Sequence, residues 1–207
     1  MTPTPWRSIN CRLPGEVGVS RSGTLAVADI TVRPAIEVIT VVSMYGAWED
    51  PAIPGAKWLY ADASVHRVIS DLSGLIDRQR GHKIIAAGDL NVLYGYGEGG
   101  SPYWRDRYAA IFSRMEALGL PFVGPQAPDG GCPARPWPDE LPKESKNVPT
   151  FRSKIKQPET ATRQLDFFFA SKEWKPRLTV RALNAPDDPD EWGPSDHCRV
   201  LIELRPA

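Results

Sequence analysis

Residues 24–32 and 38–45 are rich in apolar and β-branched residues, as strands are, and along residues 199–204 Val200, Ile202 and Leu204 alternate with their neighbours. A period of two is typical of a strand with one face on a core and the other in water. Arg33, Pro34 and Ala35 break the chain between the first two stretches, which therefore predict a β-hairpin. The segment KIIAAGDLN is apolar without alternation, as in a strand covered on both faces, and this strand is expected to end at Gly88. QLDFFFAS predicts a further strand.

Two other stretches place apolar residues at steps of three and four, which is the spacing of an amphipathic helix. The first covers residues 62–80, with Asp62 or Ser64 available as its N-terminal cap. The second covers residues 105–118. A glycine follows each stretch and provides a stop. These patterns predict two helices that lie on a sheet.

Strand and helix patterns interleave along the whole chain, which predicts a single domain of the α/β class over residues 1–207. Residues 1–22 are expected to form a loose N-terminal segment. Residues 124–149 contain seven prolines and predict a long Pro/Gly-rich surface loop. Loops of this length are more often functional or mobile than plain connections.

The composition excludes several classes of protein. Twenty-five basic residues balance twenty-five acidic ones, so a polyanionic partner has to be held locally rather than by net charge. The three cysteines are widely separated, which favours free thiols over a disulfide framework. No stretch resembles a signal peptide or approaches the roughly 20 apolar residues of a membrane span. These features predict a cytoplasmic protein without membrane contact, and they leave its oligomeric state open.

Three acidic sites stand where predicted strands meet loops. They are Asp89 in GDLN, Asp166 in QLDFFF, and Asp196 beside His197 in SDH. Each motif alone is common in turns. In this order, each with its strand, the three motifs resemble the endonuclease/exonuclease/phosphatase superfamily, which has the DNase I-like fold. The resemblance covers residues 24–204.

The resemblance implies a four-layered α/β sandwich with a cleft at the loop ends of its sheets. It also implies a Mg²⁺-dependent (or Mn²⁺-dependent) phosphoesterase that hydrolyses a phosphodiester with a metal-activated water, in the manner of a nuclease. The substrate would be a phosphoester, with DNA or RNA as candidates. Two alternatives remain open: a weakened remnant that binds nucleic acid or protein, and a phosphatase for inositol phosphates or other small molecules.

The matching motifs also imply roles for individual residues. Asp89 resembles the group that positions or deprotonates the attacking water, and Asn91 resembles a donor to a phosphate oxygen. Asp166 resembles the carboxylate that orients His197 against the scissile phosphate, although Phe167 replaces the usual tyrosine beside it. Tyr45 resembles the family's Tyr or His at the end of its strand. The implied metal ligands are Asp89, Asn91 and Asp196.

The chemistry requires these residue types independently of the resemblance. Attack on a phosphoester builds negative charge on oxygen, and fixed donors with a hard cation offset that charge. An imidazole bonded to a buried carboxylate keeps one tautomer and stays cationic to higher pH. If the GDLN segment is extended, Asp89 and Asn91 point into the same cleft. His66 and His82, in a helix and a turn, are predicted to be structural.

Aromatic and basic side chains follow the predicted site in sequence. They are expected either to stack on bases and touch phosphates or to pack loops onto the sheet. The predicted substrate-binding residues are Trp48, Tyr94, Tyr96, Trp104, Arg105 and Arg152.

The chain departs from the family pattern at its start. The family's first strand carries an Asn motif, and a later strand carries the glutamate that is its main metal ligand, but neither can be placed here. Asn10 and Glu16 are the only candidates before the strand at Thr24. The N-terminal metal-binding portion is therefore expected to be missing, as in a late-start version of a longer protein. Weak metal binding, low activity and exposed sheet edges should follow.

Overall fold

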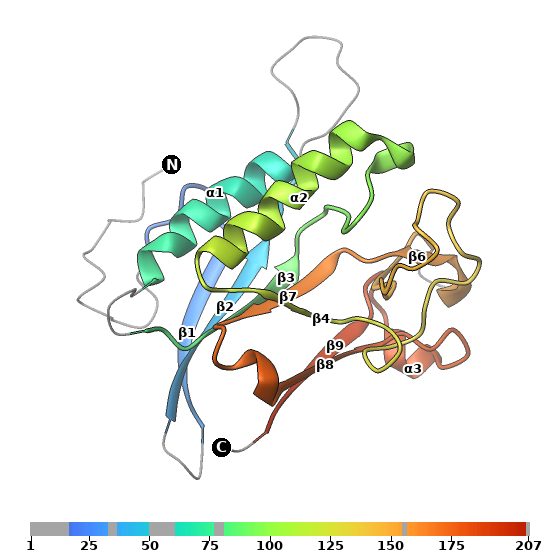
Figure 1. The fold of residues 1–207 in the computed structure, drawn as a ribbon. Coiled ribbons are helices and arrows are strands. Elements are labelled where there is room, and N and C mark those ends of the chain that lie inside the picture. Colours follow the sequence, from blue (N-terminus) through green and yellow to red (C-terminus); the bar gives the residue numbers. More distant parts are fainter. Residues whose placement is uncertain (1–16, 33–36, 50–60, 77–80, 155–156, 206–207) are drawn as a thin grey trace.

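The computed structural model describes residues 17–32, 37–49, 61–76, 81–154 and 157–205, built around a five-stranded sheet (Figure 1). The strands are β1 (Leu25–Val32), β2 (Glu37–Tyr45), β3 (Ile84–Asp89), β7 (Asp166–Ala170) and β4 (Phe122–Gly124), in that spatial order. β1 and β2 are antiparallel, as the predicted hairpin requires. β3 runs parallel to β2 and antiparallel to β7. β3 is an inner strand, in agreement with its apolar sequence.

Two helices lie side by side across one face of this sheet (Figure 1). They are α1 (Asp62–Leu72), which continues into a 3₁₀ turn at Ser73–Leu75, and α2 (Pro102–Ala117). α2 begins three residues earlier than expected because Pro102 fits the first helical turn, where no amide hydrogen is needed. Neither Asp62 nor Ser64 caps α1, whose N-cap residue is Ala61. The Asp62 carboxylate accepts a hydrogen bond from Arg107 of α2 instead.

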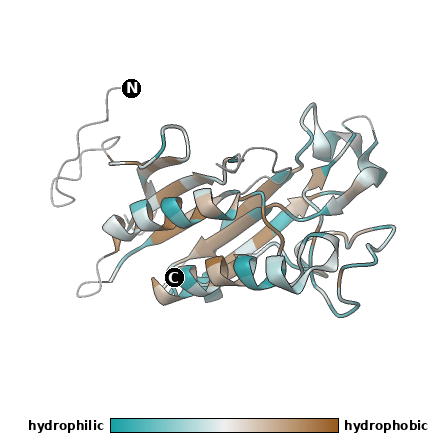
Figure 2. Cartoon of the chain, turned by 90° about the horizontal axis from the view of Figure 1, so that it is seen from above, coloured by the Kyte–Doolittle hydropathy of each residue, from teal (hydrophilic) through white to brown (hydrophobic). Residues whose placement is uncertain are grey.

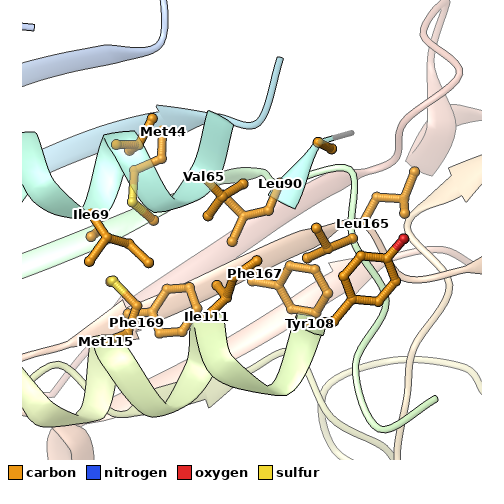
Figure 3. Packing of buried hydrophobic residues seen from close by; sticks show 14 of the residues in the cluster. Met44, Val65, Ile69, Leu90, Tyr108, Ile111, Met115, Leu165, Phe167 and Phe169 are labelled. Carbon is orange, nitrogen blue, oxygen red and sulfur yellow. The ribbon is translucent and has the colours of Figure 1, made fainter. Parts of the chain in front are cut away.

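The main core lies between the two helices and the sheet. Figure 3 shows Ile111 and Met115 of α2 facing Phe167 and Phe169 of β7, with Val65 and Ile69 of α1 beside them. Phe112 of α2 adds ring contacts to both β7 phenylalanines. In Figure 2 the strands of the central sheet are mainly hydrophobic, whereas the helices carry hydrophilic as well as hydrophobic residues. The apolar residues buried in α1 are Val65, Val68, Ile69 and Leu72, and those buried in α2 are Tyr108, Ile111 and Met115. The periodicity of the two helical stretches therefore marks their buried sides correctly.

A second, two-stranded sheet covers part of the opposite face. It consists of β8 (Leu178–Leu183) and β9 (Arg199–Leu204), which are antiparallel. Ile202 of β9 packs with Ile39, Ile85 and Trp174 in a smaller core between the sheets. The described residues thus form a helix layer, a five-stranded sheet and a short second sheet. The mixed α/β class is confirmed, and within the described ranges three of the four predicted layers are present.

After Gly124, which ends β4, the predicted loop of residues 124–149 contains no helix or strand, but much of it is packed rather than lying loose on the surface. Leu141 and Val148 are buried. Asn184, just after β8, binds both the amide and the carbonyl of Cys132 and the carbonyl of Pro149. The loop leads into a small sheet of β5 (Phe151–Arg152) and β6 (Ala161–Arg163), and a short helix, α3 (Pro189–Trp192), lies nearby. Among the described residues, no helix has the length and apolarity to cross a membrane.

Candidate active site

Three predicted site residues lie side by side in one row at one edge of the central sheet, each at an end of its strand. Asp89 at the end of β3 lies opposite Tyr45 at the end of β2 and opposite Asp166 at the start of β7. Residues that are paired across strands point to the same face of a sheet. Gly88 precedes Asp89, and a Cβ atom there would lie 1.8 Å from the carbonyl oxygen of Met44. The glycine therefore permits the close approach of β2 that brings Tyr45 beside Asp89.

The GDLN segment turns sharply after β3 rather than staying extended. Asn91 has a φ of 50°, a left-handed conformation that asparagine tolerates better than most residues. In this conformation its backbone amide donates to Asp89 Oδ1 at 2.9 Å and its side-chain amide to Asp89 Oδ2 at 3.1 Å. The side chain also donates to the carbonyl of Gly46 at 3.0 Å. Asn91 and Asp89 meet as predicted, but through a turn in which Asn91 fixes the carboxylate.

His197 reaches the same row from the segment that precedes β9. Its Nδ1 lies 2.8 Å from Oδ2 of Asp166, and its Nε2 lies 3.9 Å from Oδ2 of Asp89. The backbone of His197 forms an isolated bridge to Phe151, and their ring centroids are 5.2 Å apart. The predicted contact of Asp166 with His197 is therefore present. The imidazole lies between two carboxylates that come from adjacent strands.

The surroundings perturb both titrating partners. Burial of the imidazole disfavours its charged form, but the hydrogen bond to Asp166 and the charges of Asp166, Asp89 and Asp196 outweigh burial and raise the pKa of His197. Burial and the nearby Asp166 charge raise the pKa of Asp89 to about 6, despite the opposing amide of Asn91 and the charge of His197. The site therefore holds a histidine that keeps its proton to higher pH than an isolated imidazole, beside a carboxylate that keeps its proton to about pH 6.

Arg152 supports this arrangement from behind and is not placed as a substrate contact. Its side chain is 3% exposed, and its guanidinium donates to the carbonyls of Ser195 and Gly193 and lies 5.1 Å from the centre of the Trp192 ring. The backbone amide of Arg152 also donates to the carbonyl of Asp196. Arg152 thus fixes the segment that carries His197. Its predicted role as a substrate-binding residue is wrong, because the guanidinium is buried and bonded to backbone carbonyls.

An open cleft of about 270 Å³ lies over the row. Of the predicted site residues it is lined by Tyr45, Trp48, Asp89, Asn91, Asp196 and His197. Its remaining wall consists of residues that the sequence did not single out, namely Glu98, Phe151, Arg163 and Leu165. Trp48 is 44% exposed, so its indole is available to a ligand in the cleft.

The other predicted substrate contacts lie away from this cleft. Tyr96 is 5% exposed, and burial raises the pKa of its hydroxyl to about 12. Tyr94 packs against the rings of Phe112 and Phe122, and Trp104 packs partly buried against Tyr108. Arg105 is exposed and pairs with its neighbour Asp106. The three aromatic residues therefore pack loops and helices onto the core, which was the alternative prediction, and Arg105 forms a surface ion pair.

The geometry suits only part of the predicted ligand set for a divalent cation, Asp89, Asn91 and Asp196. Asp89 and Asp196 border one cleft, and their mutual repulsion is of the kind that a cation relieves. However, the side-chain amide of Asn91 is engaged with Asp89 and Gly46. Nowhere in the described ranges do three or more His, Cys, Asp or Glu side chains gather in an arrangement that holds a metal ion. These residues alone do not make a metal site. Asn10 and Glu16 lie outside the described residues.

The two remaining histidines occupy structural positions, as predicted. His66 accepts a hydrogen bond from Arg114 at 2.8 Å, between α1 and α2. His82 bonds to the hydroxyl of Ser171 and the carbonyl of Leu118. Neither lines the cleft.

The fold and its strand-end cleft place the chain among proteins of the DNase I-like fold. No family model and no curated protein matches it. Solved structures do match it. The endonuclease domain of TRAS1, a telomere-specific non-LTR retrotransposon, aligns with 20% identity and a TM-score of 0.51 over 88% of this chain. A 3′-5′ exonuclease (NExo) from Neisseria meningitidis aligns with 16% identity and 0.51 over 98%, and an AP endonuclease (LMAP) from Leishmania major with 18% and 0.53 over 89%.

The aligned region spans 62%, 70% and 55% of those three proteins, respectively. The predicted fold class is thus confirmed, and the chain has a fold used by nucleases.

Proposed function

We propose that this protein is a phosphoesterase that hydrolyses phosphodiesters in nucleic acid. The observation that carries the proposal is the position of His197, which bonds to Asp166 at 2.8 Å, faces Asp89 at 3.9 Å and borders an open cleft. Structures of an endonuclease domain, an exonuclease and an AP endonuclease share the fold, which supports the nuclease-like reading.

In this proposal the cationic and the anionic side chains of the cleft have different roles. The His197 cation, held by Asp166, binds a non-bridging phosphate oxygen and offsets the charge that grows there during attack. Asp89, with a pKa of about 6, is ionised at neutral pH yet basic enough to accept a proton from the attacking water. Tyr45 lines the same cleft and is 41% exposed, and in this proposal its hydroxyl donates to the phosphate.

Mg²⁺ or Mn²⁺ is the cofactor that the resemblance implies, with Asp89, Asn91 and Asp196 as its predicted ligands. Since these residues alone make no metal site, we expect activation only at about millimolar cation, as for sites with few fixed oxygens. A titration of turnover with MgCl₂ and MnCl₂ measures this. Saturation at micromolar cation would contradict it and would direct attention to a further acidic ligand.

The decisive assay offers plasmid DNA, single-stranded DNA and RNA, abasic-site DNA and inositol phosphates, each with Mg²⁺, with Mn²⁺ and with EDTA. The proposal is supported if the parent protein cleaves a nucleic acid and the His197→Ala variant does not. Release of phosphate from inositol phosphates alone would replace it with the small-molecule alternative.

A second candidate function is nucleic-acid binding without turnover. The lack of a three-ligand metal cluster among the described residues favours it. Binding in EDTA that persists in His197→Ala, with no cleavage under any cation, would establish this function instead.

A further inference from the structure

Half of the cleft is not used by the proposed chemistry. Beyond His197, its wall is made by Trp48, Phe151, Glu98 and Arg163. The Phe151 ring adjoins the His197 ring, so this half begins next to the phosphate position. A ligand that places a phosphate on His197 therefore has its next group here.

The polar part of this half is a preformed ion pair. Arg163 Nη2 donates to Glu98 Oε2 at 2.9 Å, and Nη1 donates to Glu98 Oε1 at 3.3 Å. The two residues come from separate elements, β6 and the 3₁₀ turn Glu98–Gly100. Their side chains remain 40% and 34% exposed. The pair thus presents further guanidinium hydrogens and carboxylate lone pairs to the cleft.

The apolar part adjoins that pair. Phe151 of β5 lies directly opposite Arg163 of β6, so the ring and the guanidinium share one face of this small sheet. Trp48, from the segment after β2, adds an exposed indole to the same cleft. Exposed aromatic side chains are platforms on which nucleobases stack.

We propose that this half of the cleft is a subsite for an unpaired guanine adjacent to the bound phosphate. Trp48 and Phe151 provide stacking surface, while the Glu98–Arg163 pair reads the edge of the base. Guanine presents an acceptor, O6, beside two donors, N1–H and the N2 amino group. Arg163 donates to O6 and Glu98 accepts from the two donors. Cytosine and adenine offer one amino donor on that edge, so they match the pair less completely.

The subsite rests on the proposed function for its choice of nucleic acid as ligand and for the phosphate position at His197, but its test needs no turnover. The probes are GMP, AMP, CMP, UMP and inorganic phosphate, titrated in EDTA and followed by calorimetry. GMP should bind roughly tenfold more tightly than CMP, because a matched pair of edge contacts discriminates by about that factor. Equal affinity for all four nucleotides, or preference for a pyrimidine, would overturn the subsite.

Variants separate the parts of the subsite. Arg163→Gln and Glu98→Gln should each reduce the preference for GMP and leave the affinity for inorganic phosphate unchanged. Trp48→Ala should weaken all four nucleotides alike. Arg105→Ala is the matched control, because Arg105 is an exposed arginine in a surface ion pair outside the cleft. A GMP preference that survives Arg163→Gln in a protein with unchanged thermal unfolding would overturn the role of the pair.

The two proposals fail separately. Selective GMP binding by a protein that cleaves no phosphoester would keep the subsite and reject the phosphoesterase. Cleavage of nucleic acid without base preference, together with equal affinity for the four nucleotides, would do the reverse.

Discussion

His66 and His197 are both partly buried, yet their surroundings carry opposite charge. His66 lies where α1 meets α2, and its Nδ1 accepts a hydrogen bond from Arg114. Burial and the Arg114 charge lower the pKa of His66, against a smaller effect of Asp62. His197 lies at the strand ends among three carboxylates, and its pKa is raised. The same side chain is thus held neutral between the helices and favoured as a cation in the cleft.

The comparison shows that neighbouring charge, rather than burial, separates a structural histidine from a candidate phosphate ligand in this fold. Burial opposes the charged form of both rings. Only the strand-end row supplies the excess of negative charge that reverses this effect.

The largest expected effect comes from removing each histidine in turn and comparing the loss of turnover. His197→Ala and Asp166→Ala should each reduce phosphoester turnover roughly 10²- to 10⁴-fold. The double variant should lose little more than the worse single variant, because the two side chains act as one unit. Steady-state cleavage rates measure this, with His66→Ala as the control within a few-fold of the parent. Additive losses would reject the pairing.

Asp89→Asn should abolish most turnover and yet stabilise the fold. Because the folded pKa of about 6 exceeds the ordinary value of 3.8, the contribution of Asp89 to stability is complete below about pH 4 and is lost as pH rises through about 6. Removing the charge should therefore raise the free energy of unfolding at pH 7 by at most about 3 kcal/mol. Urea unfolding at pH 7 and pH 4 measures this gain, which should vanish at the lower pH.

Asp62→Asn provides the control of opposite sign. Asp62 is 1% exposed and bonded to Arg107, so its neutralisation should destabilise the protein by roughly 1–3 kcal/mol. If both variants changed stability in the same direction, the distinction between the two regions would not hold.

A smaller effect is expected on the pH profile. The kcat/KM of the parent should follow a bell-shaped pH profile. It should rise through about pH 6 as Asp89 loses its proton, and it should fall above the raised pKa of His197. The Asp166 charge raises both pKa values, so in Asp166→Asn both limbs should move to lower pH. Residual kcat/KM between pH 4 and pH 9 measures this. A profile that keeps its position would exclude Asp166 as the source of the shifts.

The smallest effect concerns the helix pair. Arg114→Gln should raise the pKa of His66, because it removes the neighbouring positive charge, and should leave turnover unchanged. NMR titration of the His66 ring protons measures the first change. An unchanged pKa would contradict the prediction and show that burial, rather than the Arg114 charge, governs this ring.

The sequence allowed the regular elements and the strand-end row of Tyr45, Asp89 and Asp166 to be predicted, because both carry strong local signals. Alternation marked β9, and three- and four-residue spacing marked the buried sides of α1 and α2. Asp89 ends an apolar strand and Asp166 begins one, so both motifs could be recognised, and the resemblance to the family matched Asp166 with His197.

The far wall of the cleft carried no such signal. Glu98, Phe151 and Arg163 belong to a 3₁₀ turn and to strands of two and three residues, which are too short to show a period. Arg152 and Tyr96 were misplaced for a different reason. A residue type that is common on surfaces can be buried when carbonyls or rings satisfy it, and those partners come from distant parts of the chain.

The common row of Tyr45, Asp89 and Asp166 also limits which changes in chain length the sheet tolerates. Side chains of a strand alternate between faces, so deleting one residue inside β3, such as Ala87, would turn Asp89 toward α1 and α2. The carboxylate would then enter the apolar layer around Phe167, and an apolar residue would take its place at the cleft. Single-residue insertions and deletions in β2, β3 or β7 should therefore disrupt the packing of the sheet itself and not only reduce turnover.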